Sequence, residues 1–130
     1  MVRTREKMKG RRSGGRFLSL PYVVLEHPEY ISLSKKAVKL LIDLAIQYNG
    51  HNNGDFCATF SMMKKRGWSS NDQLQKALKE LIAKNFIMLT RQGGKKIANL
   101  YAITWQPIDE CGGKLDISST KKAPRSFREK

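Results

Sequence analysis

The 130-residue sequence is short of acidic residues, of cysteine and of long apolar runs. It has 11 Asp or Glu against 25 Lys or Arg, which gives a formal net charge of +14. A surplus of this size predicts an acidic partner, with nucleic acid ahead of an anionic membrane. No stretch approaches the roughly 18 consecutive apolar residues of a membrane helix, and the Arg-rich start lacks the apolar segment of a signal peptide. We therefore expect a cytoplasmic protein with no membrane partner.

The spacing patterns of metal sites and disulfide frameworks are also missing. The two cysteines, Cys57 and Cys111, lie far apart in the chain and have no CxxC spacing. The two histidines, His27 and His51, form no ligand pattern with them. We expect no metal and no disulfide, and we expect Cys57 to be a small buried hydrophobic residue.

No arrangement of residues predicts catalysis. Asp109 and Glu110 are adjacent rather than facing each other, no Cys–His or Ser–His–Asp set falls on one recognisable turn, and no acidic cluster could hold magnesium. The Gly-rich stretches at residues 49–55 and 91–96 match neither GxGxxG nor GxxxxGK[ST], the two phosphate-binding patterns. We therefore expect a protein that is not an enzyme and that uses no cofactor.

Most of the excess positive charge lies near the two ends of the chain. Residues 1–16 hold seven Lys or Arg and one acidic residue, residues 17–113 hold twelve and eight, and residues 114–130 hold six and two. Residues 1–16 also have few apolar side chains to offset the entropy cost of ordering. We predict a disordered basic arm at residues 1–16, one folded domain at residues 17–117 and a flexible basic tail at residues 118–130.

The most informative stretch, residues 61–85, predicts a helix-turn-helix. It reads as a short helix, a tight turn at Gly67 and a longer helix. Ser70, followed three residues later by Gln73, fits a capping box and predicts that the longer helix begins at Asn71. Apolar residues then recur at i, i+3, i+4, i+7 and i+8, which makes one face of this helix apolar. These residues are Leu74, Ala77, Leu78, Leu81 and Ile82.

Caps and turn formers predict the elements before this unit. Ser34 is a good N-cap for a helix over residues 35–48, and a short helical turn should precede it. The polar residues 49–55 predict a surface loop, and residues 56–58 predict a short strand. Ser61 can cap the helix that follows. The expected core residues of these segments are Tyr22, Val24, Leu25, Tyr30, Ile31, Val38, Leu41, Leu44, Ala45 and Tyr48.

A β-hairpin should follow the longer helix. Residues 86–91 and 97–105 are β-prone runs separated by QGGKK, whose two glycines permit a tight turn. Asn85 is suited to the left-handed position that ends the helix before them. We expect Trp68, in the helix-turn-helix turn, and Trp105, at the end of the hairpin, to pack on the core rather than stack on bases.

The order of helix, short strand, helix, turn, helix and hairpin resembles the winged helix-turn-helix domain over about residues 30–105. More narrowly, LSKKAVKLLIDLAIQYNG followed by SMMKKRGWSSNDQLQKALKELIAKNFI is similar to the helix-turn-helix domains of plasmid and phage replication initiators and of mobile-element regulators. The resemblance implies a single α+β domain, a small helical bundle with a β-hairpin wing. It also implies a role in transcription regulation or DNA replication control on a mobile element, with the protein bound to the nucleoid.

The function that we expect is sequence-selective binding of double-stranded DNA. The helix from Asn71 would enter the major groove, and the wing and the arm would grip phosphates or an adjacent minor groove. The predicted DNA-binding residues are Ser69, Ser70, Asn71, Gln73, Lys76 and Lys79 in the helix and the turn before it, Arg91, Lys95 and Lys96 in the hairpin, and Arg11, Arg12 and Arg16 in the arm.

Two other interpretations stay open. Winged domains with basic tails also bind RNA, which would replace duplex DNA as the partner. Alternatively, the chain is a protein-interaction module that inhibits or adapts a nucleoprotein enzyme. Such a module would use the wing and the tail from Ser118 to occupy a nucleic-acid channel. In a separate, purely structural interpretation, Lys95 and Lys96 serve only to keep an edge strand soluble. A homodimer is compatible with each of these interpretations.

Overall fold

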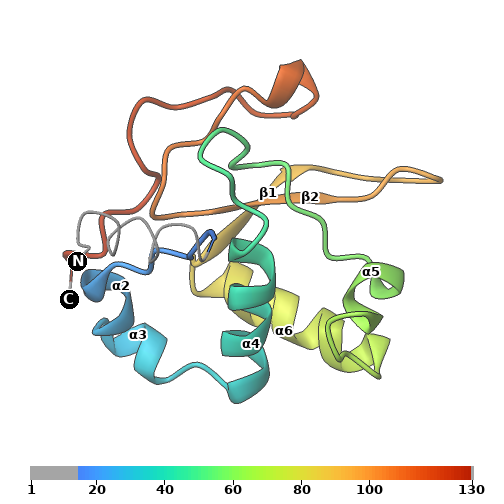
Figure 1. The fold of residues 1–130 in the computed structure, drawn as a ribbon, viewed down its shortest axis with the longest axis horizontal. Helices are drawn as coiled ribbons and strands as arrows, with labels where there is room; N and C mark the ends of the chain where they lie inside the picture. Colours follow the sequence, from blue (N-terminus) through green and yellow to red (C-terminus); the bar gives the residue numbers. More distant parts are fainter. Residues whose placement is uncertain (1–14, 130) are drawn as a thin grey trace, which may run out of the picture.

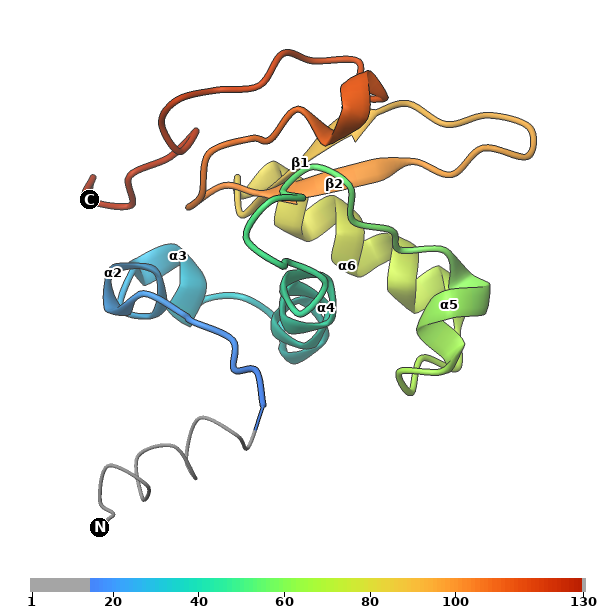
Figure 2. The same ribbon diagram turned by 45° about the horizontal axis from the view of Figure 1, so that its top comes forward.

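A computed structural model describes residues 15–129, which form five α-helices and a two-stranded antiparallel hairpin (Figures 1 and 2). The α+β class is as predicted. Most of the predicted arm, with Arg11 and Arg12, lies outside the described residues. None of the described helices is long and apolar enough to cross a membrane. The elements are α2 (Tyr22–Leu25), α3 (Pro28–Ile31), α4 (Lys35–Ala45), α5 (Phe60–Lys64), α6 (Asn71–Ala83), β1 (Ile87–Arg91), β2 (Leu100–Ile103) and the short 3₁₀ helix η1 (Cys111–Gly113).

The longest helix, α6, begins at Asn71 as predicted. The Ser70 hydroxyl accepts a hydrogen bond from the backbone N–H of Gln73 at 3.2 Å, which satisfies one of the free donors at the helix start. Asn85 follows the helix with φ = 62°, the left-handed conformation that was expected there. Ile82 is exposed at the edge of the apolar stripe. The other four predicted residues of the stripe, Leu74, Ala77, Leu78 and Leu81, are buried.

The helix α4 packs against α6, which in turn packs against β1 (Figure 1). Its start is also as predicted, because the Ser34 hydroxyl accepts from the Ala37 N–H at 3.1 Å. It ends at Ala45, earlier than expected, and Val38 and Tyr48 are only half-buried. The buried apolar residues of α4 are Ala37, Leu40, Leu41, Leu44 and Ala45.

Two predicted core residues near the start of the domain are on the surface. Tyr22 is 81% exposed and Ile31 is 72% exposed, so their assignment to the core was wrong. The reason is that α2 and α3 are single turns of four residues, and each can bury only one side. In α2 the buried residue is Val24.

The segment between α4 and α5 differs from the prediction in two ways. Residues 56–58 form an isolated antiparallel bridge between Phe56 and Tyr101 rather than a strand. The bridge buries Phe56 and leaves Cys57 half-buried, so the expected burial of Cys57 was wrong. Thr59, not Ser61, caps α5, because its hydroxyl accepts from the Met62 N–H at 3.4 Å.

The polar loop at residues 49–55 is not wholly on the surface. Asn53 is fully buried, and its side-chain oxygen accepts from the Ile103 N–H at 2.9 Å. Its side-chain nitrogen lies 2.9 to 3.0 Å from the carbonyl oxygens of Ile103, Gln106 and Pro107. The hydrogen bonds to these partners replace the hydrogen bonds to water that the amide loses on burial. They also fix the loop to the end of β2.

The end of the chain is docked, so the prediction of a flexible tail from Ser118 was wrong. After β2 the chain runs along β1, where the Asp116 N–H donates to the Thr90 carbonyl at 2.8 Å. Phe127 is then only 2% exposed, with its ring centroid 5.3 Å from that of Phe86. Isolated apolar residues in a polar segment give no periodic signal, yet one of them, Phe127, is buried in the core.

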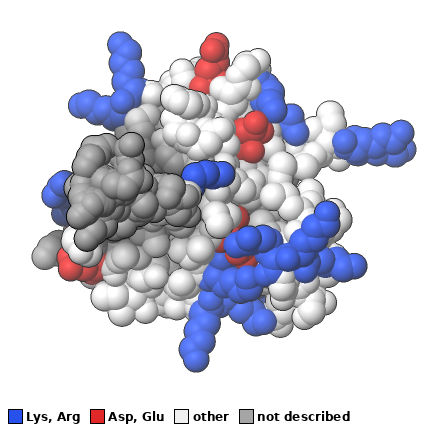
Figure 3. Space-filling view, in the orientation of Figure 1, with Lys and Arg blue, Asp and Glu red and all other residues white. Residues whose placement is uncertain are grey.

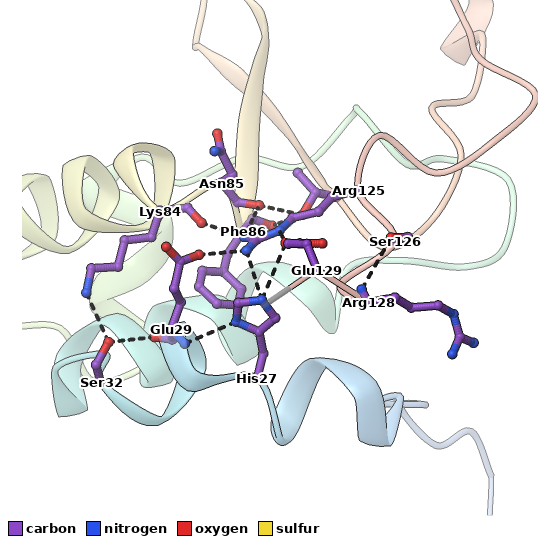
Figure 4. Close-up of polar contacts among 11 residues, drawn as sticks. His27, Glu29, Ser32, Lys84, Asn85, Phe86, Arg125, Ser126, Arg128 and Glu129 are labelled. Atoms are coloured by element: carbon purple, nitrogen blue, oxygen red, sulfur yellow. Dashed lines mark hydrogen bonds and ion pairs between the residues drawn. The ribbon is translucent and has the colours of Figure 1, made fainter.

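A polar cluster fixes this C-terminal segment to α3 and to the end of α6 (Figure 4). Arg125 donates to the Lys84 carbonyl at 2.7 Å and to the Glu29 carboxylate at 2.6 Å, and it pairs with Glu129. Burial lowers the pKa of Arg125, but its bonds to the two carboxylates outweigh this effect and raise it. His27 lies beside the cluster and caps α3 through Nδ1, which accepts from the Glu29 N–H at 3.1 Å.

Candidate nucleic-acid interface

The helix-turn-helix unit consists of α5, a turn at Arg66–Trp68 and α6. Gly67 has φ = 96°, a left-handed conformation that glycine adopts without steric cost. Trp68 follows it and is only 5% exposed, so it lies in the core as predicted. Its indole Nε1–H donates to Asp43 Oδ2 at 2.8 Å, which links the turn to α4.

Asp43 is the centre of this link. Its carboxylate is 3% exposed and accepts from Lys39 Nζ at 2.9 Å and from Arg66 Nε and Nη2 at 3.1 and 3.0 Å, besides Trp68. Lys39 Nζ also donates to the Arg66 carbonyl at 2.7 Å. A buried carboxylate needs such partners to offset desolvation. We missed this cluster in the sequence, although the i, i+4 spacing of Lys39 and Asp43 was a signal for part of it.

The predicted DNA-binding residues of α6 and of the turn before it divide into two groups by exposure. Ser69, Asn71, Lys76 and Lys79 are exposed at the start and along the outer side of α6, whereas Ser70 and Gln73 are half-buried. The Ser70 hydroxyl is occupied by its capping bond. Lys76 Nζ lies 3.3 Å from the carboxylate of Asp72, so part of its charge is compensated within the helix.

The hairpin lies beside α6. Its strands pair from Ile87 with Ile103 onward, with a shift in register between Leu89 and Arg91. A small groove of about 160 Å³ separates it from the helix, and Gln75 and Leu78 of α6 line one side of this groove. The facing residues on the other elements are Ala58, Thr59, Asn99 and Tyr101.

The three basic residues predicted on the wing do not lie together. Lys95 and Lys96 are exposed at the tip. Arg91 is half-buried, and its Nη2 donates to the Ala98 carbonyl at 2.8 Å across the hairpin. Arg91 therefore stabilises the base of the tip, and the two lysines are the cations that the tip of the hairpin presents.

A larger group of six cations lies on α4, α5 and the turn, and none of the six was predicted to bind DNA. All six residues are exposed, and Figure 3 shows Lys and Arg side chains gathered over this part of the molecule. The pairs and triplets KK and KKR were visible in the sequence, but nothing local indicated that the fold would bring them together. We call this group the α4–α5 basic surface; its residues are Lys35, Lys36, Lys39, Lys64, Lys65 and Arg66.

Arg16, the one cation of the predicted arm among the described residues, lies away from α6. It is exposed at the edge of a cavity of about 620 Å³ with Phe17, Ile46, Tyr48 and Trp105 among the lining residues. None of the residues that line this cavity comes from α6 or from the tip of the hairpin.

The two thiols are not activated in this fold. Burial, with the charge of Asp55, raises the pKa of both Cys57 and Cys111. Both thiols therefore remain protonated at neutral pH, which disfavours a role as nucleophile. Within residues 15–129, no group of three or more His, Cys, Asp or Glu side chains could hold a metal ion.

Comparison of the chain with protein-family profiles, with curated proteins and with solved structures finds no match.

Proposed function

We propose that the chain is a winged helix-turn-helix protein that binds double-stranded DNA in a sequence-selective way through α6. The observation that carries the proposal is the free start of α6, where Ser69, Asn71 and Lys76 are exposed while the opposite side of the helix is buried. Hydroxyl, amide and ammonium groups are the donors and acceptors that read base edges in a major groove.

The surroundings of α6 support the proposal. A glycine turn joins it to α5, and the hairpin lies beside it across a shallow groove. Lys95 and Lys96 at the hairpin tip would contact backbone phosphates of a duplex that α6 enters. On the outer side of α6, Asp72 pairs with Lys76, which leaves Lys79 as the exposed cation without an ion pair among the described residues. The helix would therefore supply selectivity, and other cations would supply most of the affinity.

The biological role that we propose is transcription regulation or replication control on a mobile element, in the cytoplasm and at the nucleoid. This step rests on the resemblance of residues 33–50 and 61–87 to replication initiators and mobile-element regulators.

The test compares the helix with the wing on a site selected from a random duplex pool. Replacing Asn71 or Lys76 with Ala should cost about 1 to 3 kcal/mol of binding free energy on the selected site and much less on random duplex, because only base contacts distinguish sequences. Replacing both Lys95 and Lys96 with Ala should weaken binding to all duplexes alike and make the salt dependence shallower by about 0.9 log–log units per lost contact. Fluorescence anisotropy across a salt series measures both.

Other outcomes would select a different function. Equal losses on selected and random duplex in the helix variants would mean that α6 does not read sequence. Displacement of the duplex by a structured RNA at much lower concentration would make RNA the partner. A wild-type protein that binds neither nucleic acid at physiological salt would be an interaction module.

A further inference from the structure

We propose that the α4–α5 basic surface is a second nucleic-acid site, which binds the phosphate backbone of a DNA segment other than the one on α6. The inference rests on the proposed function only in taking nucleic acid as the partner. The second site would bind DNA without sequence specificity. One protein molecule could then hold two duplex segments.

The first argument is the balance of charge on this surface. Residues 35–39 and 64–66 contain no acidic residue. One turn further along α4 lies Asp43, whose buried carboxylate compensates Lys39 and Arg66. Among the described residues, no ion pair involves the other four cations of the surface, which are Lys35, Lys36, Lys64 and Lys65. Four uncompensated like charges repel one another, and a polyanion relieves this repulsion.

The second argument is that part of the surface is held in place. Asp43 binds the Nε and Nη2 atoms of Arg66, and within the described part of the chain Nη1 makes no hydrogen bond. The Arg66 side chain is still 42% exposed. An arginine oriented by a buried carboxylate in this way loses little entropy when its remaining N–H groups bind a phosphate.

The third argument is the location of the surface. Because α4 and α6 pack against each other, their outer rows point away from each other. Lys35 and Lys36 are exposed at the start of α4, and Lys79 is exposed on α6. In the view of Figure 3 the cations gather on the side of α4 and α5. A duplex that lies along the outer side of α6 would therefore leave the cations of α4 open.

The surface fits nucleic acid better than a membrane. Residues 35–39 and 64–66 contain no large apolar side chain that is exposed. A face that binds membranes combines cations with apolar side chains that enter the lipid. Cations alone suit the closely spaced phosphates of a nucleic-acid backbone.

The experiment uses the full chain and two duplexes. The duplex selected for α6 is immobilised, and a fluorescent duplex of random sequence is added with the protein. The variant Lys64→Gln with Lys65→Gln removes two exposed charges and leaves the Asp43 cluster intact. The matched control is Lys121→Gln with Lys122→Gln, which removes the same charge from an exposed pair in the C-terminal segment.

We expect the wild-type protein and the control to recruit the second duplex. The Lys64/Lys65 variant should lose this recruitment, with a salt dependence shallower by about two log–log units, while its affinity and selectivity for the immobilised duplex change little. Recruitment that persists in the variant would overturn the inference, because the duplexes would then be joined through another contact, such as a protein dimer.

Three further outcomes would also overturn it. If the wild-type protein binds the immobilised duplex but recruits no second one, the proposed function stands and the second site does not exist. If it binds no duplex at all, both fail together. The same variants are also tested on phosphatidylcholine vesicles with and without phosphatidylserine. Loss of binding only to the anionic vesicles would assign the surface to a membrane.

Discussion

Two buried polar side chains, Asp43 and Asn53, hold distant parts of this fold together. Asp43 on α4 accepts from Trp68, 25 residues further along the chain, and Asn53 bonds to Ile103, 50 residues away. Neither link could be predicted from the sequence, because nothing near either residue identifies its partner. The cap at Ser70 was predictable since its partner, Gln73, lies three residues away.

The Asp43 cluster makes a prediction about Trp68. Trp68→Phe should lower the free energy of unfolding by about 1 to 3 kcal/mol, because it leaves the buried Asp43 carboxylate without one of its donors. Urea unfolding followed by circular dichroism measures the loss. The control is Trp105→Phe, which removes a similar ring volume from a side chain that makes no hydrogen bond within residues 15–129. Equal losses in the two variants would show that ring volume, not the hydrogen bond, stabilises the turn.

At the scale of elements, the sequence predicted the long helices and the elements whose ends are marked by a local cap or turn. The helices α4 and α6 and the hairpin were predictable from N-caps, from a 3.6-residue apolar period and from turn glycines. The short helices α2, α3 and α5 were placed less well, since one turn has too few residues to show a period. The docked C-terminal segment has no period at all, and only the position of Phe127 in the fold reveals its role.

The docked segment gives the second stability prediction. Phe127→Ala should destabilise the protein by about 3 to 5 kcal/mol, the usual cost of removing a buried aromatic ring. Leu78→Ala on α6 should cost about 2 to 5 kcal/mol for the same reason. The comparison is made by thermal or urea unfolding of the full chain, with the exposed Arg128→Ala as the control for a change at this end. A melting temperature unaffected by Phe127→Ala would mean that the segment is a free tail after all.

At the scale of the whole molecule, the net charge predicts an acidic partner but does not predict which surface would bind it. Most of the excess charge was counted near the two ends of the chain, yet Arg125, in the C-terminal segment, is compensated by Glu29 and Glu129. The folded part presents its own cluster on α4 and α5 instead. A count of charges along the sequence cannot separate compensated from free cations, because the partners come together only in the fold. For the candidate site, the exposed start of α6 and the basic tip of the hairpin were therefore predictable, and the basic surface was not.

The arm remains the largest local excess of positive charge, with six Lys or Arg and one acidic residue in residues 1–14. Deleting residues 1–14 should weaken binding to every duplex and make the salt dependence shallower, because phosphate contacts carry no information about base sequence. The order of preference among sequences should stay the same, since α6 is unchanged. Anisotropy titrations of the selected and random duplexes across a salt series measure both effects, and an unchanged unfolding curve serves as the control for the fold. A truncated protein that keeps its full affinity at moderate salt would leave the arm without a part in DNA binding, whereas a changed order of preference would make it a reader of the minor groove.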